Sequence, residues 1–159
     1  MSTSAHSVAA PPEKAYFDLH TQGCGYLSRI RWVNPRKGAG RQGKPFLACA
    51  INALHGDTTD PSYSYFDVRV TDDACLELVQ SLQKDVDAGR KVFVAFKIGD
   101  IYPHSYTAEV KDQATGQVQQ EARAIIKGRL FLVTHVKVDG ETRYERPPQQ
   151  LEQRNGTQG

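Results

Sequence analysis

The stretch GYLSRIRWV–NPRKGAGRQGK–PFLACAINAL, residues 25–54, decides the fold of this chain. Its two apolar segments, 25–33 and 45–54, read as β-strands joined by a long loop. No acid lies between Leu19 and Gly56. The stretch carries six cations, namely Arg29, Arg31, Arg36, Lys37, Arg41 and Lys44. A glycine-rich and purely basic β-hairpin is typical of a surface that holds a polyanion.

Alternating apolar and polar residues predict further strands at 63–70 and 91–98. The outward positions of the predicted strands include Phe46, Tyr65, Arg69 and Lys97. The alternation of the first strand slips at about Ile30, and a bulge or sharp bend there would bury both Ile30 and Val33.

Residues 71–89 change to apolar spacings of three and four, which predicts one helix that Gly89 ends. A long polar excursion follows at 99–121, and its middle, 112–117, is either the tip of a hairpin or a mobile loop. Residues 122–138 form a fifth strand, and the Asp-Gly turn after it predicts a short hairpin strand at 141–145.

The predicted order is therefore β-β-β-α-β-β with an additional C-terminal hairpin strand, which is mainly β and favours an OB-fold barrel. In that fold the helix plugs the barrel, and the connections between strands 1–2 and 4–5 flank the ligand face. Both connections are long and polar here. We predict one folded domain at 16–145, with disordered tails at 1–15 and 146–159.

The composition excludes several classes of protein. The 159 residues are 39% hydrophobic and 24% charged, and no apolar run approaches the roughly 18 residues of a membrane helix. The N-terminus has no cationic start and no apolar core of a secretory signal. The three cysteines are widely spaced and odd in number, which favours a reducing cytoplasm over a disulfide framework or a zinc site.

Four segments carry a resemblance to a known family: YFDLHTQGCGYLSRIRWVNPRKG, KPFLACAINALHG, FDVRV and KVDGETRY. They resemble replication-associated proteins encoded on integrative and conjugative elements of proteobacteria, a family similar to single-stranded DNA-binding proteins. The resemblance covers about 16–144. It implies a bacterial mobile element, an OB-type barrel and single-stranded DNA as the partner. Replication or conjugation proteins are further expected partners.

The chain departs from this family in two places. The loop between the first two strands is longer, with AGRQG inserted, so loop contacts do not transfer residue by residue. The C-terminal tail holds one acid, Glu152, and lacks the acidic tip that ends in Phe, by which housekeeping single-strand binders recruit repair enzymes. A role as a recruiting hub is therefore not expected.

Single-strand binding needs aromatic platforms for bases and cations for phosphates. The predicted platforms are Trp32, Phe46 and Tyr65, with Tyr102 and Tyr106 from the polar excursion. The predicted phosphate contacts are Arg29, Arg31, Arg69 and Lys97 on the strands and Arg36, Lys37, Arg41 and Lys44 in the loop. Trp32 is either a core residue at the bulge or a stacking platform. A one-residue error in register would bury Phe46 and Tyr65.

Two alternatives stay open from the sequence: a protein-interaction OB module and an RNA-binding protein. Catalysis finds little support, so we expect neither an enzyme nor a cofactor nor a metal. The five histidines are scattered, and RKGAGRQGK lacks the order of a nucleotide-binding P-loop. Strand edges at 141–145 and in the first strand predict a homo-oligomer.

Overall fold

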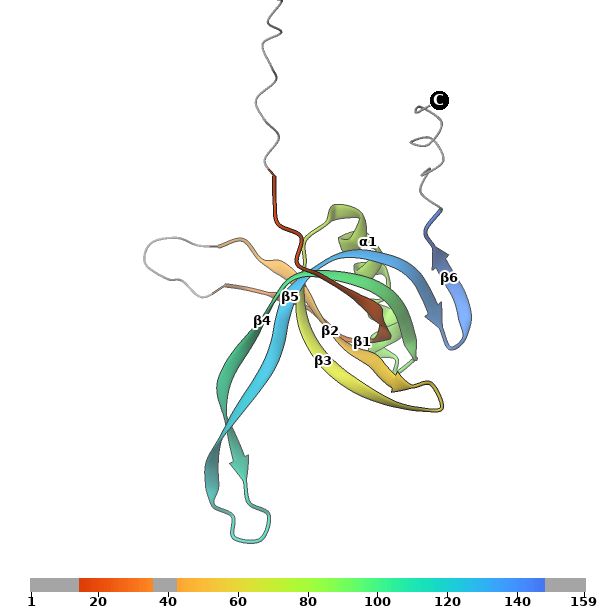
Figure 1. The fold of residues 1–159 in the computed structure, drawn as a ribbon. Coiled ribbons are helices and arrows are strands. Elements are labelled where there is room, and N and C mark those ends of the chain that lie inside the picture. The colour runs from red at the N-terminus through yellow and green to blue at the C-terminus, as the bar shows by residue number, and fades with distance from the viewer. Residues whose placement is uncertain (1–14, 36–42, 148–159) are drawn as a thin grey trace, which may run out of the picture.

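The computed structural model describes residues 15–35 and 43–147. Within them the chain is mainly β, as predicted, and its elements follow the predicted order (Figure 1). The elements are β1 His20–Val33, β2 Phe46–Asp57, β3 Asp60–Val70, α1 Asp73–Ser81, α2 Gln83–Asp87, β4 Val92–Lys111, β5 Val118–Val138 and β6 Glu141–Glu145. The predicted tails, 1–15 and 146–159, lie almost wholly outside the described residues.

Five strands form a closed ring of sheet. Antiparallel pairing makes β3, β2, β1, β4 and β5 neighbours in that order. Parallel pairing between β3 and β5, from Phe66 opposite Ile126 to Val70 opposite Leu130, closes the ring. β6 then extends the sheet from the end of β5. α1 packs against β5 and α2 against β1.

The core lies inside the ring, where alternate residues of the strands meet. The inward residues that alternation predicts for β3 and β4 are all buried: Phe66, Val68, Val70, Val92, Val94, Phe96 and Ile98. Ala48 and Ala50 of β2 occupy the outer face, yet both are buried. Their side chains are small, and their register neighbours Arg31 and Asp67 form an ion pair beside them.

A bulge interrupts β1 at the predicted place. The register with β2 shifts between Ser28 and Arg31, and Arg29 takes a φ of 49°. Ile30 is buried as predicted, whereas Val33 is only half-buried and lines the outer face with Arg31 and Phe46. The prediction that a bulge buries both residues is therefore right for Ile30 and wrong for Val33, because Val33 lies two residues after the outward Arg31.

The single predicted helix is divided in two. Leu82, with φ −91° and ψ −4°, separates α1 from α2. The carboxylate of Asp72 caps α1 by accepting a hydrogen bond from the Cys75 N–H at 3.1 Å. Gly89 has a φ of 77° just after α2, as expected of a residue that ends a helix.

The polar excursion is a two-stranded arm. β4 and β5 pair from Tyr102 opposite Lys127 to Lys111 opposite Val118, and this arm, residues 102–127, projects from the ring (Figure 1). Residues 112–117 form its tip, where the Asp112 N–H donates to the Gln117 carbonyl at 2.9 Å. The hairpin alternative is therefore confirmed, and the strands are much longer than predicted.

Among the described residues, neither helix has the length and apolar character required to cross a membrane.

The approach of β1 to β2 depends on Gly25. A Cβ at this position would collide with the carbonyl oxygen of Asn52 and lie 2.8 Å from the Cα of Ala53. Both obstacles are backbone, so we expect Gly25→Ala to lower the free energy of unfolding by about 1–3 kcal/mol, measured by urea denaturation. Gly23→Ala is the matched control, because the nearest atom to its Cβ is 3.7 Å away. Equal losses in the two variants would contradict this packing.

Candidate nucleic-acid interface

The outer face of β2 and β3 presents side chains that the sequence assigned to a ligand. Tyr65 and Arg69 point outward from β3, where they alternate with the buried residues Phe66, Val68 and Val70. Phe46 begins β2 and is half-buried. The predicted parity of these strands is therefore correct, and it places aromatic and cationic groups on one surface.

A cleft of about 520 Å³ opens where the end of β1 meets the start of β2 and the base of the arm. Trp32, Phe46 and Tyr102 supply its aromatic lining. Its cations are Lys44, Arg69 and Arg129. Trp32 is 47% exposed, so of the two sequence interpretations the structure excludes a fully buried core residue.

Arg69 and Phe46 are coupled within this cleft. The guanidinium carbon of Arg69 lies 4.4 Å from the centroid of the Phe46 ring, in cation–π geometry. The stacking orients a cation that forms no ion pair within the described residues, and its N–H groups can still donate to an anion. Neither group needs to reorganise before binding, which lowers the entropic cost of contact.

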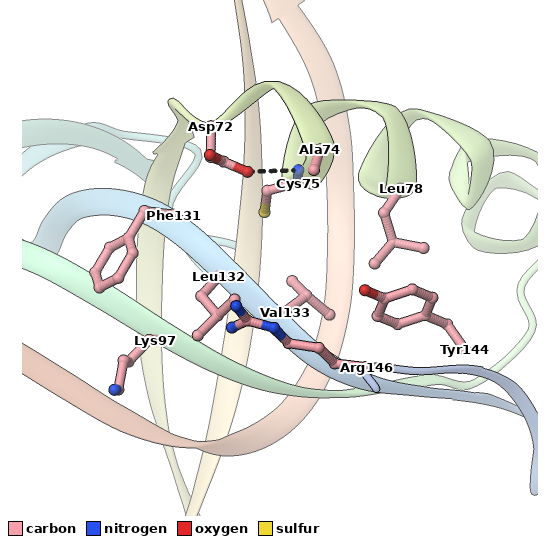
Figure 2. Close-up of a pocket in the computed structure, with 10 residues that line it drawn as sticks. All are labelled: Asp72, Ala74, Cys75, Leu78, Lys97, Phe131, Leu132, Val133, Tyr144 and Arg146. Carbon is pink, nitrogen blue, oxygen red and sulfur yellow. Dashed lines mark hydrogen bonds between the residues drawn. The ribbon is translucent and has the colours of Figure 1, made fainter. Parts of the chain in front are cut away.

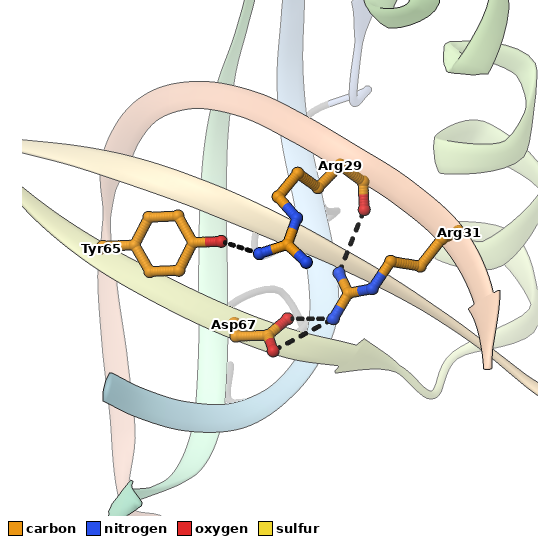
Figure 3. A network of polar contacts seen from close by, with 4 residues as sticks. All are labelled: Arg29, Arg31, Tyr65 and Asp67. Carbon is orange, nitrogen blue, oxygen red and sulfur yellow. Dashed lines mark hydrogen bonds and ion pairs between the residues drawn. The ribbon is translucent and has the colours of Figure 1, made fainter. Parts of the chain in front are cut away.

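Figure 3 shows a polar network further along the same face. Arg31 donates to both carboxylate oxygens of Asp67, at 2.8 and 3.0 Å, and to the carbonyl of Arg29 at 3.1 Å. Arg29 donates to the hydroxyl of Tyr65 at 2.9 Å, and this hydrogen bond raises the pKa of Arg29 above its ordinary value. Asp67 neutralises Arg31, whereas Arg29 forms no ion pair with a carboxylate of the described residues.

The arm carries the two remaining predicted aromatics. Tyr102 and Tyr106 are 53% and 38% exposed, and they lie on one face of β4 because they are four residues apart. His104 lies between them on that face, with its ring stacked on Tyr106 at 6.4 Å between centroids. Tyr106 is close enough to Arg29 to contribute to the raised pKa of that residue. Tyr102 also lines a hollow with Asp67 and Arg69, so the base of the arm meets the outer face of β3.

One predicted residue does not join this site, and three others cannot be placed in it because they are not described. Lys97 points outward from β4, but it lines a different hollow, with α1 and β5, because β4 lies on the other side of β1 from β2 and β3. The other three, Arg36, Lys37 and Arg41, lie outside the described residues.

The sequence interpretation missed two cations of β5. Lys127 lines the outer face beside Asp67 and Tyr102, and Arg129 lines the cleft. Arg129 is paired with Asp100 at 2.8 Å, so Lys127 is the one of the two without a carboxylate partner in the described chain. The signal was the alternation around Gly128, which places Lys127 and Arg129 on the same side of the strand.

A row of side chains across four strands was also missed. Phe93, Tyr26, Asn52 and Tyr65 are successive register neighbours on β4, β1, β2 and β3. The rings of Tyr26 and Phe93 meet edge to face at 5.9 Å. Tyr26 and Tyr63 line a hollow of about 480 Å³ with Arg90 and Lys91. Only pairing across strands reveals such a row, which no single segment predicts.

Two of the three free cysteines, Cys49 and Cys75, are buried. Burial raises the pKa of Cys75 to about 12 and raises the pKa of Cys49 further, so both thiols stay protonated at neutral pH. Among the described residues, no three His, Cys, Asp or Glu side chains gather as a metal site would require.

Comparison with known proteins gives one match. Residues 10–152 match a family described as "Protein of unknown function (DUF3577)". No curated protein and no solved structure matches the chain.

The ion pair of Arg31 and Asp67 should contribute measurably to stability. One guanidinium nitrogen, Nη2, contacts both carboxylate oxygens, and the pair is partly buried. We therefore expect a coupling free energy of about 1–2 kcal/mol in a double-mutant cycle of Arg31→Met and Asp67→Asn, measured by urea unfolding. The exposed pair of Arg123 and Glu121 on the arm is the control, with an expected coupling below about 0.5 kcal/mol. Couplings of the same size would show that the Asp67 pair is only a surface contact.

Proposed function

We propose that this chain, which belongs to the DUF3577 family of unknown function, binds single-stranded DNA. The proposal rests on the residues of its own surface. The binding surface is the outer face of β2 and β3 together with the cleft at Trp32. The observation that carries the proposal is the meeting of three aromatic rings and an unpaired Arg69 in that cleft.

The architecture supports an OB-fold. Five strands form the ring, and the helices come between β3 and β4 in the chain. The cleft beside β2 and β3 is lined by Lys44 and Pro45, at the end of the β1–β2 connection, and by Tyr102 at the base of the arm between β4 and β5. Oligonucleotides bind OB-folds on this face and between these two connections. The aromatic and cationic residues are concentrated at the same place.

The chemistry of the cleft suits a single strand better than a duplex. Exposed rings such as Trp32 and Tyr102 offer faces for unpaired bases, each worth roughly 1–3 kcal/mol. Bases in a duplex are already stacked on one another and cannot use those faces. The resemblance to replication proteins of integrative and conjugative elements suggests where such a strand arises, which is during replication or transfer of a mobile element.

The ion pairs limit how many cations can hold phosphate. Asp67 and Asp100 neutralise Arg31 and Arg129. Among the described residues, the cations of this face that form no ion pair are Arg29, Lys44, Arg69 and Lys127. Affinity should therefore be moderate and should depend on salt.

Titration with oligo-dT at low salt should quench the fluorescence of Trp32, the single tryptophan, because a base stacks on its exposed ring. Four phosphate contacts predict a slope of log K against log salt of about −3, and a steeper slope if Arg36, Lys37 and Arg41 also make contact. Competition with matched RNA and duplex oligomers separates the alternatives. Absence of any oligonucleotide binding would instead favour a protein-interaction module.

Charge variants test the location of the site. Arg69→Glu should weaken oligo-dT binding by about tenfold or more, because it replaces an unpaired cation of the cleft with an acid. Asp67→Asn should strengthen binding, because it releases Arg31. Lys84→Glu on α2 makes the same charge change at an exposed site away from the cleft, and fluorescence anisotropy should show little effect. Equal weakening by Arg69→Glu and Lys84→Glu would place the site elsewhere.

A further inference from the structure

A second hollow, of about 420 Å³, lies where α1, β5 and β6 meet (Figure 2). Its lining includes Leu78 of α1, three successive residues of β5 and Tyr144 of β6. The cleft at Trp32 has a different lining, with no residue in common. We therefore treat this hollow, called the α1–β5 groove, as a separate surface.

The groove lies at a gap in the pairing of β5. The ladder of β3 with β5 ends at Leu130, and the ladder of β5 with β6 begins at His135. Between them, in the described part of the chain, Leu132 and Val133 pair only with β4, and Phe131 lies at a register shift without a strand partner. The carbonyls at the two ends of this gap, those of Leu130 and Thr134, accept from the N–H groups of Thr71 and Arg146. The free edge is therefore short, and an edge without a neighbouring strand is a place where an extended peptide can dock.

The wall of the groove is apolar. Phe131 and Leu132 are half-buried, and Leu78 and Tyr144 are only partly covered by the core. Covering these side chains with apolar groups of a partner lowers the free energy by roughly 25 cal/mol per Å² of apolar area buried.

The charged rim of the groove is positive. Lys97 and Arg146 both line it, and neither forms an ion pair with the described residues. The one acid of the lining, Asp72, uses its carboxylate to cap α1 (Figure 2). Two cations beside an apolar wall complement a segment that carries acids next to large apolar residues.

We propose that the α1–β5 groove binds an extended acidic and apolar segment of a partner protein. Apolar side chains of the segment cover Leu78 and Leu132, and its carboxylates meet Lys97 and Arg146. The chain's own ends do not fit this description, because 1–14 and 148–159 hold one acid each, Glu13 and Glu152. Since the groove shares no residue with the cleft, a partner can be held while DNA is bound.

Selection of random peptides displayed on phage tests this proposal on the full chain. Peptides are selected on the natural protein after depletion on the double variant Lys97→Glu/Arg146→Glu. Enriched peptides should contain more Asp and Glu than the starting library, with a large apolar residue nearby. A synthetic, fluorescein-labelled copy of the most enriched peptide should bind the double variant at least about tenfold more weakly in anisotropy titrations.

The controls separate the groove from the cleft. Arg69→Glu should leave peptide affinity unchanged, and circular dichroism with thermal unfolding checks that each variant is folded. If charge reversal prevents folding, Lys97→Gln and Arg146→Gln should still weaken the peptide. No enrichment, enrichment without acids, or equal affinity for the charge variants would overturn the proposal. Oligo-dT titration of the same proteins measures DNA binding independently of peptide binding. A failure of the DNA proposal can therefore be distinguished from a failure of the peptide proposal.

Discussion

The parallel pairing of β3 with β5 is the constraint on which the rest of this structure depends. Without it the strands would form an open sheet with two exposed faces. Closure gives the sheet an inner face and an outer face, and the alternate apolar residues of each strand fill the interior. Closure also determines where the arm begins. The pairing of β5 with β3 starts at Ile126, so the part of β5 before Ile126 pairs only with β4 among the described residues. Gly128 permits the close approach of β5 to β4 at this point, since a Cβ on residue 128 would lie 2.7 Å from the side chain of Ile98.

Internal ion pairs decide which of the cations on the outer face are available. Arg31 and Arg129 each contact a carboxylate at 2.8 Å, whereas Arg69 is held by an aromatic ring and Arg29 by a hydroxyl. These partners differ in how much of the arginine's charge and hydrogen-bonding capacity remains available to a phosphate. A carboxylate cancels the charge, whereas a ring or a hydroxyl orients the side chain and leaves its charge in place. The number of arginines therefore overstates the strength of the site.

The ring separates two surfaces of different character. The cleft combines exposed rings with cations and suits a polyanion with flat bases. The α1–β5 groove combines an apolar wall with two cations and suits a peptide. Lys97 was predicted to join the first surface but lies in the second. Strand parity predicts that a residue points outward, but it does not predict on which side of the closed ring that residue lies.

The sequence by itself determined the strands, the order of elements, the bulge at Arg29 and the outward parity of Tyr65 and Arg69, because all of these follow from local periodicity and short-range sterics. It did not determine the length of β4 and β5, whose polar arm is held by pairing between the two strands and not by burial. Nor did it determine the exposure of Trp32, the pairing of Arg31 with Asp67, or the place of Lys97. Those depend on which strands become neighbours when the ring closes, and contacts between residues more than thirty positions apart leave no periodic trace in the chain.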